Sequence, residues 1–161
     1  MDRRTVMMGL ALAAPLTVEA AAESAAENPV IAAFAKTLSA HDIGGFAALF
    51  ADDYVNHQMS AAAPKPAAGV SPKQASVGFF AARLKGLPDL SVAIEASLSS
   101  GDMAAASFVY TGTHQGEYFG VAPTGKSLRF TSCDIFRIRD GRIAEHWGMG
   151  DIAGTLAQLK G

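Results

Sequence analysis

The stretch IFRIRDGRIAEHWGMGD, residues 135–151, decides the fold of the C-terminal half of the chain. Asp140 and Gly141 stand between two runs that alternate apolar and polar side chains, which predicts a β-hairpin with a two-residue turn. With that turn, residue 138 pairs with 143, 136 with 145, 134 with 147 and 132 with 149, and paired residues point to one side of a sheet. His146 then lies on the outer face. The predicted inner face carries Leu128, Phe130, Asp134, Phe136, Ile143, Glu145, Trp147 and Met149.

Two carboxylates on this otherwise apolar face require an explanation, because ionised carboxylates are rarely buried without a partner. Asp134, in mid-strand beside the predicted position of the Trp147 indole, favours a sheet that curves around a pocket. The alternative is that Asp134 satisfies a buried donor or pairs with an arginine. Glu145 lies nearer the rim of the hairpin, where a structural role is the simpler interpretation.

The preceding chain predicts helices first and strands afterwards. Residues 28–50 contain two amphipathic helical pieces. The first is opened by Asn28 as N-cap, and its apolar face carries Val30, Ile31, Phe34 and Leu38 at helical spacing. Residues 71–84 predict a third helix, which begins with a capping box and carries Val77, Phe80, Ala81 and Leu84 on one face. Alternating strands follow over residues 89–151, and a short helix N-capped by Asp151 closes the chain. This order predicts an α+β domain with helices packed on one face of a curved antiparallel sheet.

Residues 1–22 have the pattern of a bacterial export signal. Arg3 and Arg4 precede an apolar run and a small-residue tail, and the arginine pair is typical of a twin-arginine signal. The apolar run is shorter than the ~20 residues that a membrane helix needs. The alternative is an uncleaved helical tail of a cytoplasmic protein. We expect a periplasmic or secreted protein with no membrane association after the signal is removed, and a single domain over residues 28–161.

Composition argues against several classes of protein. The chain has 161 residues and a net charge of −2, with no basic run downstream of its N-terminus, so we expect no nucleic-acid partner. Cys133 is the single cysteine and cannot form an internal disulfide. The four histidines are too scattered to predict a metal site.

A succession of short motifs over residues 30–160 resembles the SnoaL-like polyketide cyclase (ester cyclase) family of the NTF2-like superfamily. The stretches are FADDYVNHQ (50–58), GLPDLSVAIE (86–95), GTHQGEYFGVAPTGKSLRF (112–130), DIFRIRDGRIAEHWGMGD (134–151) and LAQL (156–159). The resemblance implies a cone, in which a strongly bent antiparallel sheet wraps around a pocket closed by N-terminal helices. It also implies a dimer formed through the outer sheet face.

The resemblance also implies a chemistry. In cyclases of this family, an aspartate deep in the cone is the general acid and base of an intramolecular aldol closure, and neither a metal nor an organic cofactor is used. A carboxylate in a poorly hydrated cone has a raised pKa, so it can hold and return a proton near neutrality. The family's acid belongs to the segment just after Trp147, but residues 148–150 here are Gly-Met-Gly. If the acid belongs at 148 or 149, Asp134 is the only deep carboxylate left.

The register and the resemblance together give the candidate residues. Tyr54, Asn56 and His57 match the segment that lines the mouth of the cone, and His114 either lines the pocket or orders the QGEYFG segment after it. The catalytic candidates are Asp134, Asp151 and His57. The substrate-binding candidates are Tyr54, Asn56, His114, Phe130, Trp147 and Met149.

Three functions fit these patterns. The first is cofactor-independent acid/base catalysis, of the cyclase or isomerase type, on a small apolar carbonyl compound. The second is a non-catalytic periplasmic ligand-binding module with the same cone, which the Gly-Met-Gly segment at 148–150 favours. The third is a dimeric accessory domain whose outer face, with Arg129, Arg137 and Arg139, contacts a partner.

We expect a homodimer in each case. On the predicted outer face, Ile135, Ala144 and His146 interrupt the charged side chains, which would allow two copies of this face to pack together.

Overall fold

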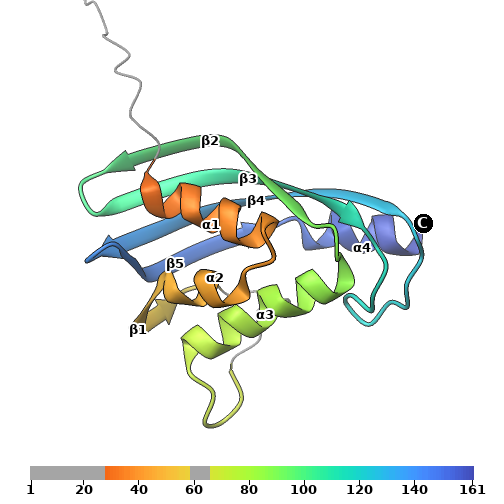
Figure 1. The fold of residues 1–161 in the computed structure, drawn as a ribbon, viewed down its shortest axis with the longest axis horizontal. Helices are drawn as coiled ribbons and strands as arrows, with labels where there is room; N and C mark the ends of the chain where they lie inside the picture. The colour runs from red at the N-terminus through yellow and green to blue at the C-terminus, as the bar shows by residue number, and fades with distance from the viewer. Residues whose placement is uncertain (1–27, 59–65) are drawn as a thin grey trace, which may run out of the picture.

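The computed structural model describes residues 28–58 and 66–161, and the predicted export signal lies outside the described residues. Helices precede most of the strands, which confirms the predicted α+β class (Figure 1). None of the helices in the described ranges has the length and apolarity to cross a membrane. The elements are α1 (Pro29–Ser39), α2 (Ile43–Ala48), β1 (Phe50–Asn56), α3 (Pro72–Gly86), β2 (Ser91–Ser100), β3 (Met103–Thr113), β4 (Ser127–Arg139), β5 (Arg142–Gly150) and α4 (Ile152–Lys160).

The strands form one curved five-stranded sheet in the order β1-β5-β4-β3-β2. Figure 1 shows α1, α2 and α3 together over one face of this sheet and α4 at its end. The sheet is mixed rather than antiparallel throughout, because β1 pairs parallel with β5. The sequence analysis ended the second helical piece at residue 50 and predicted no strand over residues 51–58, so it missed β1.

Aromatic side chains fill the space between the helices and the sheet. Phe34 of α1 lies at the centre, with its ring centroid 5.0 Å from that of Phe46, 4.9 Å from that of Phe108 and 5.5 Å from that of Phe136. In α1 the side chains that face inward include the predicted ones, Val30, Ile31, Phe34 and Leu38. Each fully buried side chain of this size contributes about 1.5–3 kcal/mol through removal of apolar surface from water.

Helix α3 is turned slightly from its predicted orientation. The sequence analysis placed Val77, Phe80, Ala81 and Leu84 inward; Phe80 is buried, and Val77 and Leu84 pack half-buried against the core, as predicted. The other buried residues are Ser76, Arg83 and Gly86, on the polar side of the predicted face. The helix is thus rotated towards that side. This rotation carries a serine and an arginine into the interior of the cone.

The β4–β5 hairpin has the predicted turn but a different register. Asp140 and Gly141 both have positive φ, 52° and 69°, as a two-residue turn of this kind requires. Arg139 pairs with Arg142 and Ile138 with Ile143, as expected. The register then shifts by one residue at Ala144, so that residue 137 pairs with 145, 135 with 147 and 134 with 148. Ala144 is therefore the extra residue of a β-bulge.

The bulge exchanges the two faces of β5 from Ala144 onward, since side chains alternate with period two. The prediction that Glu145, Trp147 and Met149 share a face with Asp134 is wrong. His146 faces the interior instead, and Met149 is 78% exposed. Ile143 and Ala144 are both buried and both apolar, so apolar/polar alternation could not reveal that Ala144 is the extra residue.

Candidate active site

Asp134 is the buried carboxylate at the centre of the site. It lies in mid-strand on β4 and is 6% exposed, as its strand position predicted. Its Oδ1 atom lies 2.7 Å from Nε2 of His146, and its Oδ2 atom accepts a 2.5 Å hydrogen bond from the hydroxyl of Ser132. Asp134 and Ser132 are two residues apart, so both point to the same face of the sheet.

His146 is held by both of its ring nitrogens. Nε2 faces Asp134, and Nδ1 lies 3.2 Å from the hydroxyl of Tyr54. Its ring stacks on Phe136 with centroids 5.0 Å apart and planes inclined by 10°. These contacts leave the imidazole no free rotation.

A series of donors reaches His146 from β1 and α3. The side-chain amide of Asn56 donates to the hydroxyl of Ser76, which donates to the hydroxyl of Tyr54. Burial raises the pKa of Tyr54 to about 12, so this phenol stays protonated and can donate to Nδ1 of His146. The proton of the neutral imidazole then lies on Nε2 and is donated to Asp134. This direction of donation accounts for every partner in the series.

A second series reaches Asp134 from β3. The hydroxyls of Ser132 and Tyr110 lie 3.3 Å apart. Ser132 has one hydrogen, and a carboxylate only accepts, so we assign that hydrogen to Asp134 and infer that Tyr110 donates to Ser132. Burial raises the pKa of Tyr110, with nearby Arg83 acting in the opposite direction, and the phenol stays protonated. Both oxygens of Asp134 therefore accept hydrogen bonds from buried donors.

Gly148 makes room for this arrangement. It pairs with Asp134 across the β4–β5 ladder. A Cβ atom at position 148 would lie 2.6 Å from Oδ1 of Asp134 and 2.7 Å from Nε2 of His146, which no real side chain tolerates. The Asp134–His146 pair thus occupies the space of a side chain at 148.

Arg83 brings a positive charge to the same interior. It is 5% exposed, and its Nε–H donates to the hydroxyl of Tyr118 at 3.0 Å. Its guanidinium carbon lies 4.6 Å from the ring centroid of Tyr110 and 5.1 Å from that of Phe130, with Phe79 and Phe80 at similar distances. Phe130 and Tyr110 stack on each other with centroids 5.1 Å apart.

The structure brings some of the predicted site residues together around Asp134. Tyr54 and Phe130 lie in the buried interior, and Asn56 joins the donor series through Ser76. His114 is fully buried, and its Nδ1 atom accepts the backbone N–H of Thr124. Of its two predicted roles, the contact shown is the ordering of the connection between β3 and β4.

The other predicted site residues lie elsewhere. Asp151 is exposed and caps α4 by accepting the backbone N–H of Gly154. His57 stacks on Trp147, with centroids 4.4 Å apart, and contacts Oε2 of Glu145 at 2.8 Å on the outer face. Trp147 and Met149 are on that face because of the bulge. The contact with His57, followed by that with Arg137, lowers the pKa of Glu145 although burial opposes this.

Sequence reasoning missed His146, Ser132, Tyr110, Ser76 and Arg83 as site residues. His146 was lost with the register at Ala144. For Arg83 a signal was present, since it follows Phe80 by three residues and Ser76 by seven, a spacing that places all three on one face of a helix.

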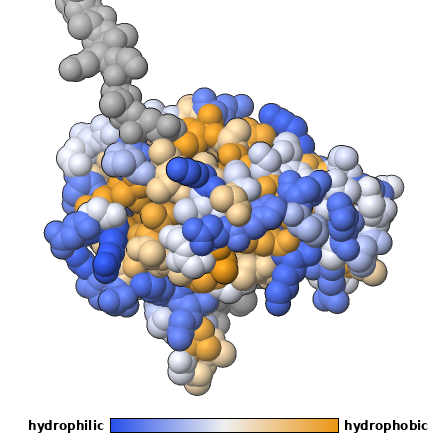
Figure 2. Space-filling view, viewed as in Figure 1, coloured by the Kyte–Doolittle hydropathy of each residue, from blue (hydrophilic) through white to orange (hydrophobic). Residues whose placement is uncertain are grey.

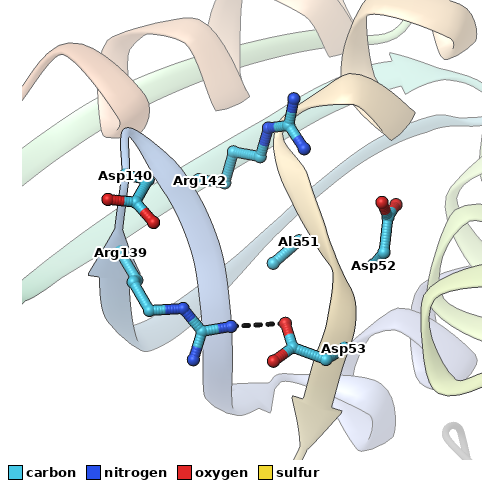
Figure 3. A pocket seen from close by; sticks show the side chains of 6 residues that line it. All are labelled: Ala51, Asp52, Asp53, Arg139, Asp140 and Arg142. Atoms are coloured by element: carbon cyan, nitrogen blue, oxygen red, sulfur yellow. Dashed lines mark hydrogen bonds and ion pairs between the residues drawn. The ribbon is translucent and has the colours of Figure 1, made fainter.

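A depression lies away from this site, at the tip of the β4–β5 hairpin beside β1 (Figure 3). It is open and charged, and it contains an ion pair between Arg139 and Asp53. It is lined by Ala51, Asp52, Asp53, Arg139, Asp140 and Arg142. No predicted site residue contributes to it. On the helix-covered side of the molecule, hydrophobic residues show between hydrophilic ones (Figure 2). Within residues 28–58 and 66–161, no group of three or more His, Cys, Asp or Glu side chains could hold a metal ion.

Comparison with known proteins identifies the family. The family model described as SnoaL-like polyketide cyclase matches residues 29–159. The chain belongs to the SnoaL-like polyketide cyclase family. No curated protein matches the sequence.

Solved structures agree with this assignment. IdmH of Streptomyces antibioticus, a candidate polyketide cyclase, is 31% identical, with a TM-score of 0.69 over 81% of this chain and 95% of IdmH. AclR of Streptomyces galilaeus, a candidate hydroxylase, is 25% identical, with a TM-score of 0.68 over 81% of this chain and 78% of AclR. A Catenulispora acidiphila protein with a ketosteroid isomerase-like fold shares 18% identity and a TM-score of 0.63, over 81% of this chain and 92% of that one. The predicted NTF2-like fold is confirmed.

Proposed function

We propose that this protein is a cofactor-independent acid/base catalyst of the cyclase or isomerase type, acting on a small apolar carbonyl compound with Asp134 as its base and acid. The observation that supports the proposal is the buried Asp134–His146 pair, 2.7 Å apart within an aromatic interior. A carboxylate in such a place is positioned by its neighbours and shielded from bulk water. Those are the conditions under which a carboxylate abstracts a proton next to a carbonyl efficiently.

The position of Asp134 adds a second argument. The family resemblance leads one to expect a carboxylate at residue 148 or 149, where this chain has glycine and methionine. Asp134 pairs with Gly148 across the ladder, and its Oδ1 atom lies only 2.6 Å from where the Cβ of residue 148 would be. The neighbouring strand therefore delivers a carboxylate to nearly the same place.

The proposed proton transfer uses this chain's own groups. Asp134 removes a hydrogen α to the substrate carbonyl and later returns it to a carbon or oxygen of the product. Hydrogen bonds from His146 and Ser132 hold the carboxylate in one orientation throughout. The stacked rings of Phe130 and Tyr110 offer an apolar wall for the substrate.

The experiment is to follow exchange of the methyl hydrogens of acetophenone for deuterium in D2O by NMR. We expect the wild-type protein to accelerate exchange. We expect Asp134→Asn to lower the accelerated rate by about 100- to 10,000-fold, the usual contribution of a general acid or base. Asn keeps the shape of the side chain but accepts no proton. Asp53→Asn is the matched control, because it removes a carboxylate from the depression at the tip of the β4–β5 hairpin. It should leave the rate unchanged.

The main alternative, a ligand-binding module without turnover, rests on a specific observation. Both oxygens of Asp134 already accept hydrogen bonds within the protein, as a purely structural carboxylate would. In that case Asp134→Asn lowers the free energy of unfolding by about 1–3 kcal/mol, and the exchange rate is the same in both proteins. That pair of results would refute the catalytic role.

A further inference from the structure

Arg83 is a buried cation with no carboxylate partner among residues 28–58 and 66–161. Its guanidinium forms no ion pair with a described residue, whereas Asp134 accepts a hydrogen bond from His146, and half-buried Arg137 and exposed Arg139 each contact a carboxylate. Residues 59–65 contain no Asp or Glu. An arginine stays charged at any physiological pH, so this charge is present in the folded protein.

The surroundings of Arg83 accept hydrogen bonds from only some of its N–H groups. Its guanidinium has five N–H donors. In the described part of the chain the hydroxyl of Tyr118 accepts one of them, from Nε, at 3.0 Å, and the hydroxyl of Tyr110 also interacts with the guanidinium. Four aromatic rings lie within 5.1 Å of the guanidinium carbon and stabilise the cation through their faces, but they accept no conventional hydrogen bond. The negative charge of Asp134 stabilises this cation through space, but Asp134 makes neither a hydrogen bond nor an ion pair with it. Burying a charge is unfavourable while its N–H groups lack acceptors, and an anion that accepts them would remove this cost.

The position of Arg83 relative to Asp134 suggests what that anion is. Tyr110 lies between them, under the guanidinium at 4.6 Å on one side and linked through Ser132 to Asp134 on the other. A ligand that contacts both residues would have an anionic oxygen at the Arg83 end. Its carbon chain would lie along Tyr110 and Phe130, with an acidic C–H at the Asp134 end.

We propose that Arg83 binds a carboxylate of the ligand, so that the ligand class is carbonyl compounds that also carry a carboxylate. Arginine suits this task because its planar fork matches the two oxygens of a carboxylate. The inference rests on the proposed function only where it places the carbonyl end of the ligand at Asp134. Recognition of the carboxylate itself requires no turnover.

The test compares two ligands that differ only in charge, 3-benzoylpropanoate and its methyl ester, by isothermal titration calorimetry at pH 7 and low salt. We expect the wild-type protein to bind the acid at least about tenfold more tightly than the ester, a modest value for a charge-assisted, partly desolvated contact. Equal affinities, or no binding of either ligand, would overturn the proposal without recourse to any variant.

Variants then assign the preference to Arg83. In Arg83→Met, which keeps length and apolar volume, the acid and the ester should bind equally, and Arg83→Lys should keep part of the preference. Lys85→Met removes an exposed charge from the same helix and should keep all of it. Near-ultraviolet circular dichroism checks that each variant is folded. A folded Arg83→Met protein that still prefers the acid would contradict the proposal.

The outcome is independent of that for Asp134. Wild-type protein that prefers the acid but does not accelerate acetophenone exchange would refute the proposed catalysis and leave the carboxylate site standing. Exchange that depends on Asp134, together with equal binding of acid and ester, would refute the carboxylate site and leave the proposed catalysis standing.

Discussion

At the scale of single residues, Gly148 determines whether the buried pair can form. Its two neighbours cannot move aside easily, because Asp134 accepts from Ser132 and His146, and His146 is fixed by Tyr54 and Phe136. The glycine is therefore needed for the space above it and not for its backbone freedom. A close-packed interior tolerates an added methyl group poorly when its neighbours are locked in this way.

We expect Gly148→Ala to lower the free energy of unfolding by about 1–3 kcal/mol, through overpacking against Asp134 and His146. Urea denaturation measures the change. Gly78→Ala is the matched control. Gly78 is exposed to solvent in the middle of α3, and nothing lies within 4 Å of a Cβ added there. It should raise stability by about 0.5–1 kcal/mol, because alanine is the better helix former. If the two substitutions had the same effect, the steric argument for Gly148 would be wrong.

At the scale of elements, the sequence predicted what depends on local pattern. The inward face of α1, the caps at Asn28 and Ser71 and the turn at Asp140 and Gly141 were all predicted, because each follows from spacing or from a few adjacent residues. The burial of Asp134 was also predicted, since it depends on the alternation within β4 alone.

Features that depend on tertiary pairing were not predictable in the same way. Strand β1 is short and pairs parallel with a strand about 90 residues later in the chain, so nothing local marks it. The bulge at Ala144 adds one apolar residue beside another, Ile143, and both are buried. His146 was predicted on the outer face but contacts Asp134 in the interior. Trp147 was predicted on the inner face but lies on the outer one.

The fluorescence of Trp147 tests the bulge directly, because it is the only tryptophan of the chain. With the bulge, the indole lies half-buried on the outer face, with the ring of His57 parallel to it at a centroid distance of 4.4 Å. We expect acrylamide to quench the folded protein appreciably, and His57→Ala to increase the quenching further. His41→Ala, at the α1–α2 junction, should have no effect. Quenching as weak as that of a core indole would mean that Trp147 faces the interior and that the bulge is absent.

At the scale of the whole molecule, the helices α1, α2 and α3 of the described residues leave the outer face of the sheet uncovered. A row of paired residues crosses four strands on this face, from Leu98 through Ala105 and Ile135 to Trp147. Leu98 is 66% exposed and Ile135 46%, and Met149 lies one row away. The predicted reasons for a homodimer need correction, because Ala144 and His146 face inward. Ile135 is on the outer face as predicted, and Leu98 and Met149 supply apolar surface that sequence reasoning did not assign there.

We expect two copies of the chain to pack through this row, because exposed apolar side chains gathered on one face mark an association surface. Ile135→Lys places a charge at the middle of the row, and it should convert the dimer to a monomer at micromolar concentration without lowering the melting temperature of the fold. Light scattering coupled to size-exclusion chromatography gives the mass. Val70→Lys is the matched control, since Val70 is similarly exposed but lies in the segment before α3, and it should remain dimeric. A monomeric wild-type protein would remove the prediction, and a dimer that survives Ile135→Lys would place the interface on another surface.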